Sequence, residues 1–546
     1  MSVAHKDLHS KLTLGGLLVS LGIIYGDIGT SPLYVMKAIL GDHIINADIV
    51  LGGISCVFWT LTLQTTIKYV LITLSADNHG EGGIFALYAL VKKTKIRWLI
   101  VPAIIGGSAL LADGIITPPI SVSSAVEGVR TFYPEINTIP IVIGILFILF
   151  TIQQFGTKLV GKFFAPMMLI WFTMLAVLGG LQIAKHTEVL HAINPYYAYK
   201  LLSIHPDGFF VLGFVFLCTT GAEALYSDLG HCGRKNIRAS WAVVKVCLLV
   251  NYLGQAAWLM HQGDPLLQGR NPFFEIMPHW FLIAGIIIAT TATIIASQAL
   301  ISGSYTLISE AMNLNFWPRV KVRQPSEMKG QIYIPSVNVI LWVGCVMMIL
   351  YFRNSTHMEA AYGLSITVTM MMTTILLIAW LWRNRVNKLF IAIFALVYLS
   401  IEIGFFSANI IKFFEGGWIT VFLAGFVAVC MYAWYNGRMI KQNFIKFVKL
   451  KDYVSTIKDI KLDESIPKYA TNLAFLSRAK RDDEVESKII YSIMRSQPKR
   501  ADHYFILNII NQEDPFTYKY SIDEVMPGTV YKVNFLLGFK IDRKIQ

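Results

Sequence analysis

Charged residues are scarce in this chain of 546 residues: they make up 15% of it, whereas hydrophobic residues make up 55%. Soluble globular proteins carry about 25% charged residues. Cysteine is scarce as well, and the six cysteines are too scattered to indicate a disulfide framework or a metal-ligand spacing. No nucleophile–base pair or metal cluster is recognisable, so an enzyme is not expected. These absences argue against a soluble protein and indicate one that is built into a membrane.

Long hydrophobic runs are what the chain has in abundance. About twelve stretches approach the roughly 20 apolar residues that are needed to cross a bilayer. They lie at 12–38, 49–74, 98–126, 138–155, 162–184, 208–230, 240–261, 280–312, 336–352, 358–382, 388–411 and 416–437. The expected fold is therefore an all-α polytopic membrane protein with about twelve transmembrane helices.

Basic residues gather in alternate loops between these stretches. The loop after the second stretch carries Lys92, Lys93, Lys95 and Arg97, whereas the loop after the third carries only Arg130. Because cytoplasmic loops hold the excess of lysine and arginine, both termini should be cytoplasmic. The same pattern accounts for the net charge of +13 without a nucleic-acid partner.

The composition changes near residue 438, where basic residues and acidic runs such as DDEVE become frequent. We therefore expect a membrane domain over residues 1–437 and a small cytoplasmic α/β domain over residues 438–546. The short apolar segments KIIYSIM, HYFILNII and TVYKVNFLLGF are interpreted as strands of that second domain. A regulatory or assembly role is expected for it, and the alternative is a stabilising appendage.

The first hydrophobic stretch is interrupted by the segment YGDIGTSPLY at residues 25–34. Its two glycines and Pro32 disfavour a continuous helix, and irregular backbone at membrane depth is tolerated only where it is buried in protein or lines water. Asp27 adds a carboxylate, which is costly in a bilayer and marks a functional site. Together with carbonyl and hydroxyl oxygens, including that of Tyr34, it forms the kind of oxygen cage that replaces the water around a monovalent cation. The alternative, a proline kink whose polar groups satisfy one another, leaves the aspartate unexplained.

The sixth stretch has a similar interruption, TTGAEALY at residues 219–226, with hydroxyls such as that of Thr220 and an acid, Glu223. Two sets of five stretches would then each begin with a broken helix, which is typical of inverted-repeat transporters with a midplane site. The alternative for Glu223 is a pairing with a basic neighbour inside a helix. Glu127 and Glu402, in contrast, are interpreted as interfacial residues near the ends of their stretches.

The third stretch contributes Asp113, Thr117 and Ser121, whose spacing puts them on one face of a helix. A further buried carboxylate exceeds what one monovalent cation requires, and burial strengthens the hold of a carboxyl group on its proton. Proton coupling without a cofactor is therefore expected, and the alternative is that Lys68 or another buried base neutralises Asp113. In the tenth stretch, Tyr362 either faces the cavity or anchors the helix as an aromatic residue.

Six segments in one order resemble the KUP family of potassium uptake proteins, also written KT/HAK/KUP. These segments are YGDIGTSPLY, ADGIITPPISVSSAVEG, GTKLVGKFFAPMM, TTGAEALYSDLGH, TATIIASQALISG and GQIYIPSVN. The resemblance covers about residues 12–437. It implies a potassium–proton symporter of the amino acid–polyamine–cation (APC) superfamily, with a LeuT-like 5+5 inverted repeat in which helices 1 and 6 are broken.

The same resemblance implies roles for individual residues. The residues that would hold or admit potassium are Asp27, Tyr34, Thr117, Ser121, Thr220 and Tyr362. Asp113 and Glu223 would serve cation coordination or proton coupling. The tail is shorter than in many members of the family, so a homodimer stays open as an assembly.

The expected function is potassium uptake across the cell membrane by alternating access. Potassium enters the space between the broken helices from outside, a proton loads an acid of the third or sixth stretch, and both leave inside. The expected partners are the potassium ion, the proton and the lipid bilayer, with no cofactor. The alternatives are channel-like passive conduction of potassium and transport of a polyamine or another cation by the same fold.

Overall fold

The computed structural model describes residues 12–41, 44–78, 80–92, 94, 96–155, 161–206, 208–325, 332–479, 481, 483–494, 497–512, 517–538 and 541. The chain divides into two compact units. The first, the membrane unit, contains most of the chain up to Tyr432, and the second, the tail unit, contains the chain from Ala433 onward.

Helices make up the membrane unit. The helices up to residue 443 are α2 (Leu14–Ile23), α3 (Gly26–Thr30), α4 (Val35–Leu40), α5 (Ala47–Thr60), α6 (Ile84–Lys92), α7 (Ile100–Val126), α8 (Ile139–Ile152), α9 (Gly161–Lys185), α10 (Pro195–Ile204), α11 (Gly208–Val215), α12 (Ala222–Ser227), α13 (Leu229–Cys232), α14 (Arg234–His261), α15 (Pro272–Glu275), α16 (Leu282–Asn313), α17 (Pro335–Phe352), α18 (Ser355–Arg383), α19 (Lys388–Ile410) and α20 (Gly417–Asn443). Shorter helical segments include η1 (Ser31–Leu33), the π-helix η2 (Leu61–Ile72), η8 (Phe216–Thr219) and η9 (Ile411–Phe413).

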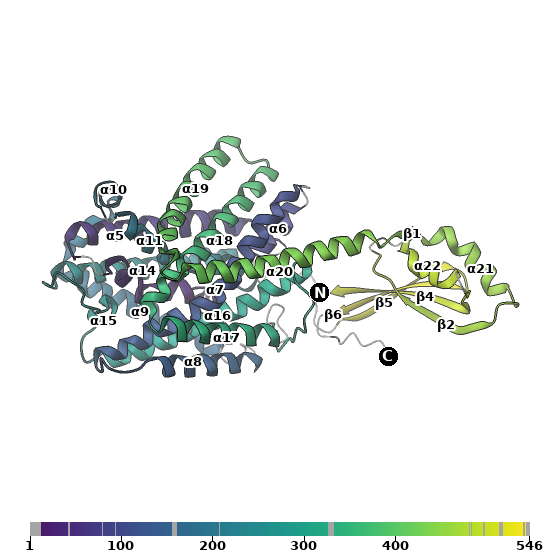
Figure 1. Ribbon diagram of the computed structural model, residues 1–546, viewed down its shortest axis with the longest axis horizontal. Coiled ribbons are helices and arrows are strands. Elements are labelled where there is room, and N and C mark those ends of the chain that lie inside the picture. Colours follow the sequence, from purple (N-terminus) through teal and green to yellow (C-terminus); the bar gives the residue numbers. More distant parts are fainter. Residues whose placement is uncertain are drawn as a thin grey trace. The chain divides into compact units, whose positions relative to one another are not determined.

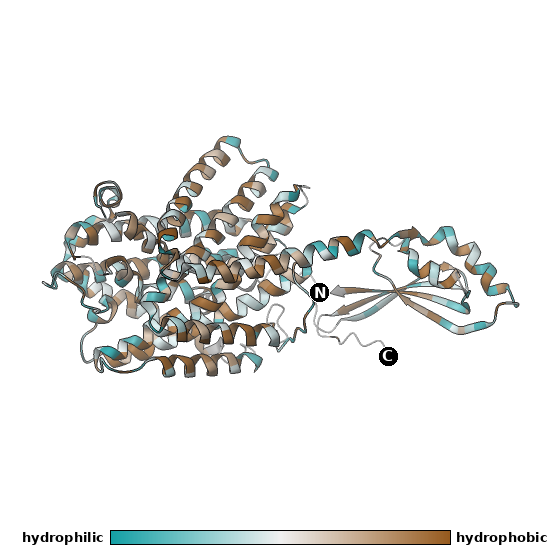
Figure 2. Ribbon diagram, in the orientation of Figure 1, coloured by the Kyte–Doolittle hydropathy of each residue, from teal (hydrophilic) through white to brown (hydrophobic). Residues whose placement is uncertain are grey.

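Ten helices among the described residues are long and apolar enough to cross a membrane. An eleventh crossing results if the bent pair Gly15–Ile23 and Gly26–Leu33, whose axes meet at 66°, counts as one span. The segment Ile139–Phe155 is a shorter apolar helix. Figure 2 shows hydrophobic residues along helices such as α8 and α17 and hydrophilic residues in the loops at helix ends. The chain is therefore a multi-pass membrane protein, with ten or eleven crossings by length against the twelve expected.

Helix α7 has a central place in this unit. It packs along α16 and α18, while α14 packs along α9 (Figure 1). Nearly all of its residues are buried although Pro118 and Pro119 lie inside it. Close packing depends on small residues, because a Cβ atom at Gly106 or Gly107 would overlap Ile84 or Phe85 of α6. The polar residues of α7 are thus held in the protein interior and away from lipid.

Two spans are broken where the sequence predicts it. The first changes direction between Ile23 and Gly26 and continues as α3 and η1. The sixth passes from α11 through η8 to α12, and Gly221 at this break has a φ of +83°. This left-handed conformation disfavours every residue with a Cβ atom, so the glycine allows the turn.

The tail unit contains a four-stranded sheet in the order β2-β4-β6-β5, formed by Lys468–Leu476, Arg500–Gln512, Val530–Gly538 and Tyr518–Met526. β2 and β6 pair parallel with β4, and β5 pairs antiparallel with β6. The short strands β1 (Phe447–Lys449) and β3 (Glu484–Glu486) pair separately. Helices α21 (Val454–Leu462) and α22 (Ser487–Met494) share a core with the sheet.

The interpretation of the tail segments as strands is confirmed for HYFILNII in β4 and TVYKVNFLLGF in β6. It is wrong for KIIYSIM, which is α22. Ile489, Ile490 and Ile493 are buried against the core. Their spacing of one, three and four residues fits one face of a helix and does not alternate as a strand would.

Candidate cation site

At the break in the first span, side chains from other parts of the chain bind the backbone carbonyls. Several carbonyls that the break releases are already bound, since Trp171 Nε1 donates to Gly29 O at 3.0 Å and Gln255 Nε2 donates to Pro32 O at 3.0 Å. Asn271 Nδ2 likewise donates to Leu33 O at 2.8 Å. These bonds hold the irregular backbone in shape and satisfy its polar groups. The carboxylate of Asp27 is therefore the main group left to meet a cation here.

Asp27 is 2% exposed, and neither of its carboxylate oxygens has a hydrogen-bond partner among the described residues. It lies against the second break, because a Cβ atom at Gly221 would be 3.0 Å from Asp27 Oδ2. α3, which carries Asp27, packs against α7, which carries a second acid, Asp113. A buried and unpaired carboxylate is costly unless a proton or a cation neutralises it. The site therefore favours a small positive ion.

Helices α7 and α18 contribute a connected set of oxygens. Thr117 Oγ1 lies 2.6 Å from Asp113 Oδ1 and 2.8 Å from the Tyr362 hydroxyl. Tyr362 is fully buried. Tyr362 thus faces the polar interior and is not an aromatic anchor at the membrane surface. Ser121, one turn beyond Thr117, is buried, and its hydroxyl has no hydrogen-bond partner in the described part of the chain.

A second contact joins the two broken spans directly. The Tyr34 hydroxyl lies 3.3 Å from Thr220 Oγ1, which also donates to Leu217 O at 3.0 Å. Both side chains are buried. The two breaks therefore lie against each other, and their hydroxyls lie between them.

Glu223 lies beyond Gly221, at the start of α12. Its carboxylate accepts a hydrogen bond from the Tyr69 hydroxyl and another from Thr373 Oγ1 at 3.1 Å. Among the described residues, no basic side chain lies within ion-pair distance of it. Its partners are hydroxyl groups, and the pairing with a basic neighbour considered from the sequence is not observed.

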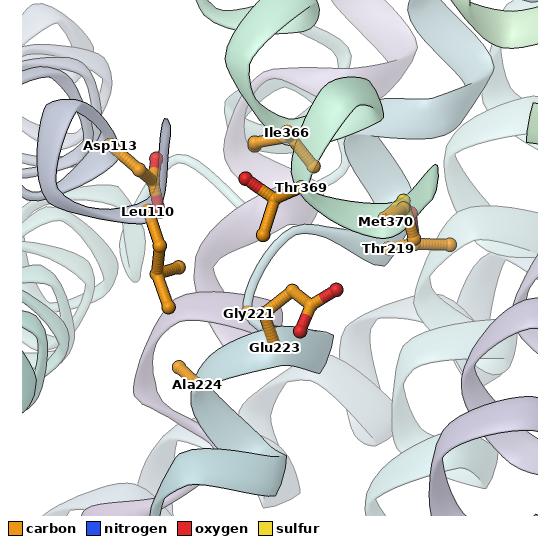
Figure 3. Close-up of a pocket in the computed structure, with 9 residues that line it drawn as sticks. All are labelled: Leu110, Asp113, Thr219, Gly221, Glu223, Ala224, Ile366, Thr369 and Met370. Carbon is orange, nitrogen blue, oxygen red and sulfur yellow. The ribbon is translucent and has the colours of Figure 1, made fainter. Parts of the chain in front are cut away.

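A small cavity lies between Asp113 and Glu223. Its lining residues are Leu110, Asp113, Thr219, Gly221, Glu223, Ala224, Ile366, Thr369 and Met370. Its volume of about 10 Å³ is close to the smallest that holds one water molecule. Figure 3 shows Asp113 and Leu110 on one side, the α12 residues on the other, and Thr369 projecting from α18 between them. Two acids thus border a space that suits one dehydrated ion or one water.

The expected site residues form three adjacent groups around the breaks. One is Asp113–Thr117–Tyr362, one is Tyr34–Thr220, and one is Glu223 with its hydroxyl partners. Asp27 lies beside Gly221 at the second break. Ser121 shares the α7 face, but within the described part of the chain its hydroxyl makes no hydrogen bond to the others.

Two interpretations from the sequence are wrong. Glu402 is not interfacial: it is fully buried in the middle of α19 and lies 2.5 Å from Lys68 Nζ. Lys68 therefore pairs with Glu402 and not with Asp113. Glu127 does lie near a span end, where it accepts bonds from Ser355 N and Oγ at 2.8 and 2.6 Å.

Two further buried residues near these groups, Tyr69 and Glu359, were not expected from the sequence. Glu359 of α18 is 1% exposed, and both of its carboxylate oxygens have no hydrogen-bond partner among the described residues. It precedes Tyr362 by one helical turn, and this spacing was the available signal. No pattern in the sequence points to Tyr69, because a single tyrosine in an apolar helix is common.

A family model and related sequences identify the same family for this chain. The family model described as "K+ potassium transporter integral membrane domain" matches residues 14–439. The chain is 64% identical over 553 residues to a probable potassium transport system protein Kup of Flavobacterium johnsoniae, covering 100% of this chain and 84% of the relative. It is 55% identical over 543 residues to the protein of the same name in Cytophaga hutchinsonii, covering 98% and 83%.

A solved structure of a manganese transporter from Eremococcus coleocola is similar at 11% identity and a TM-score of 0.43, covering 78% of this chain and 93% of that one. This likeness is too weak to support an argument.

Proposed function

From the premise that the chain belongs to the KUP family of potassium transporters, we propose that it takes up potassium across the cell membrane together with a proton. The relatives are named as potassium transport proteins, and the chain is accordingly a transporter and not an enzyme. Potassium is thus the transported substrate. The proton, the direction and the mechanism are the further content of the proposal.

The observation that carries the proposal is the state of Asp27. Its buried carboxylate has no protein partner among the described residues, and α3, which carries it, packs against α7, which carries a second acid, Asp113. A potassium ion placed there would neutralise the charge and take oxygen ligands in place of its water. We assign potassium to Asp27, Tyr34, Thr117, Ser121, Thr220 and Tyr362.

Proton coupling is assigned to Asp113 and Glu223. Both border the small cavity, and both are hydrogen-bonded to hydroxyls and not to basic side chains. A carboxyl group in such surroundings can exchange a proton without a large cost in either state, because the hydroxyls can donate to the anion and accept from the acid. No cofactor is needed for this step.

Alternating access is the proposed mechanism. We count the short helix Ile139–Phe155 and the bent first pair as crossings, which brings the number to twelve, with the first ten arranged as a LeuT-like 5+5 inverted repeat. The two broken spans at the first and sixth positions support this arrangement. Rocking of the broken spans would expose Asp27 to either side in turn.

The side on which the termini lie and the division into domains rest on the loop charges and on the composition of the tail. We propose cytoplasmic termini, a membrane domain over residues 1–437 and a cytoplasmic regulatory or assembly domain over residues 438–546, with a homodimer as the assembly to test. A polyamine is disfavoured as the substrate, because the relatives are named as potassium transport proteins.

The test is potassium uptake by purified protein in liposomes, and growth of a host that lacks potassium uptake, for the parent chain and for Asp27→Asn. We expect the parent to restore growth at low potassium and Asp27→Asn to fail at equal expression. Asp48→Asn is the matched control, since Asp48 is exposed and paired with Lys200 at 2.8 Å. Growth of Asp27→Asn equal to that of the parent would remove Asp27 from the mechanism.

The passive channel is separated by proton flux. A symporter should acidify the liposome interior as potassium enters, and Asp113→Asn should abolish that acidification. Potassium entry without proton movement in the parent would favour the channel.

A further inference from the structure

A buried ion pair lies next to the candidate site but outside it. Lys68 Nζ and Glu402 Oε1 are 2.5 Å apart, and both side chains are 0% exposed. Lys68 belongs to η2 and Glu402 to α19, which are 334 residues apart in sequence. Removing one partner of a buried pair leaves an uncompensated charge, whereas replacing both partners is often neutral. This asymmetry makes the role of the pair testable.

Hydrogen bonds connect the pair to Glu223. Lys68 Nζ donates to the Tyr69 hydroxyl at 3.2 Å, and that hydroxyl donates in turn to Glu223. Consecutive residues of α18 bind the two acids, since Thr373 donates to Glu223 and Thr374 donates to Glu402 at 2.8 Å. Hydrogen bonds therefore connect the ammonium group of Lys68 directly to Glu402 and, through the Tyr69 hydroxyl, to Glu223.

The local backbone is built to put these groups together. Residues Leu61–Ile72 form a π-helix, a rare conformation that occurs often at functional sites. Thr66 Oγ1 and Thr73 Oγ1 each donate to the carbonyl five residues earlier, at 3.0 and 2.8 Å. The wider turn brings the consecutive residues Lys68 and Tyr69 both into the interior, where they are 0% exposed.

We propose that the Lys68–Glu402 pair is a positioning element that sets how tightly Glu223 holds its proton. This inference rests on the proposed proton coupling. Lys68 favours the Glu223 carboxylate, and Glu402 offsets that effect by neutralising Lys68. The titratable and charged groups that face Glu223 from the surrounding elements are Lys68 and Tyr69 of η2, Asp113 of α7, Tyr226 of α12 and Glu402 of α19.

Single substitutions should shift the pH dependence of potassium uptake in opposite directions. In Glu402→Gln, Lys68 keeps its charge without an anion, so Glu223 loses its proton more readily and the pH of half-maximal uptake falls. In Lys68→Gln, the negative charges are unopposed, and that pH rises. A charge at this range shifts the pKa of a carboxyl group by about one unit or more. Uptake at saturating potassium, measured from pH 5 to pH 9, resolves such shifts.

The double variant Lys68→Gln/Glu402→Gln removes both charges. We expect its pH profile to return to within a few tenths of a unit of the parent profile, because the net charge beside Glu223 is restored. The exposed pair Lys200–Asp48, whose charged atoms lie 2.8 Å apart, provides the matched control. Lys200→Gln and Asp48→Asn should leave the profile unchanged.

Two readouts separate this role from a purely structural one. Thermal unfolding of each purified variant in detergent reports its folding, and the pH profile is taken per folded molecule. Opposite shifts that cancel in the double variant support the inference. Unshifted profiles, or equal losses of uptake at all pH values, overturn it. If the parent moves potassium without protons, the proposed coupling itself fails, and that result is independent of the variants.

Discussion

The substitution Gly221→Ala tests whether the two broken spans must touch. Gly221 has a φ of +83°, and this left-handed conformation costs a residue with a Cβ atom about 1–2 kcal/mol. The added methyl would also lie 2.8 Å from Ile28 N and 3.0 Å from Asp27 Oδ2. Since the first of these contacts is backbone, α3 and α12 would have to separate.

The strain alone predicts a loss of about 5- to 30-fold in the population of the competent arrangement, the factor that corresponds to 1–2 kcal/mol. We expect at least that rise in the potassium concentration for half-maximal uptake, measured with rubidium or potassium tracers in liposomes. Gly425→Ala is the control, because no atom lies within 4 Å of the added methyl. A Gly221→Ala variant with parental affinity at equal expression would refute the close approach of the breaks.

Two further predictions concern the site and the tail. Thr117→Val removes the hydroxyl that joins Asp113 to Tyr362. A hydrogen bond to a charged group contributes about 1.5–3 kcal/mol. The potassium concentration for half-maximal tracer uptake should therefore rise at least about tenfold. Ile493→Ala should lower the free energy of unfolding of the tail unit by about 2–5 kcal/mol, measured by denaturant unfolding of the full chain, since Ile493 is 1% exposed. Ile510→Ala, at a position 40% exposed, should change it little, and an equal loss would contradict the core.

Positions of the spans and breaks could be predicted because their signals are local. A run of apolar residues, or a glycine and proline beside an acid, is visible in a few tens of residues. The break at Gly221 was expected from such a pattern, and its φ of +83° agrees with it. Length alone does not fix the number of crossings, since the helix Ile139–Phe155 is shorter than a usual span.

The Lys68–Glu402 pair could not be predicted, because its partners come from distant parts of the chain. In the sequence, each is a single charge in an apolar helix, and Glu402 was expected at the membrane surface because it lies near the end of its stretch. The bond to Lys68 at 2.5 Å explains why it is buried instead. The ion pair becomes visible only in the folded structure, where Lys68 of η2 meets Glu402 of α19.

The misread segment KIIYSIM shows a different limit. A short apolar run fits either a strand or a buried helix turn, and only the core decides. Ile489 and Ile493 lie on the same face, four residues apart, and both pack into the tail core. The helix α22 is thus selected by tertiary contacts that the segment does not contain.

The central claim is that Asp27 holds a potassium ion stripped of its water between the two breaks. The most direct measurement is a cryo-electron microscopy or crystallographic map of the protein in potassium compared with one in choline. The account predicts ion density in potassium alone, within coordination distance of the Asp27 carboxylate. Density found only elsewhere, or identical maps around Asp27, would contradict it.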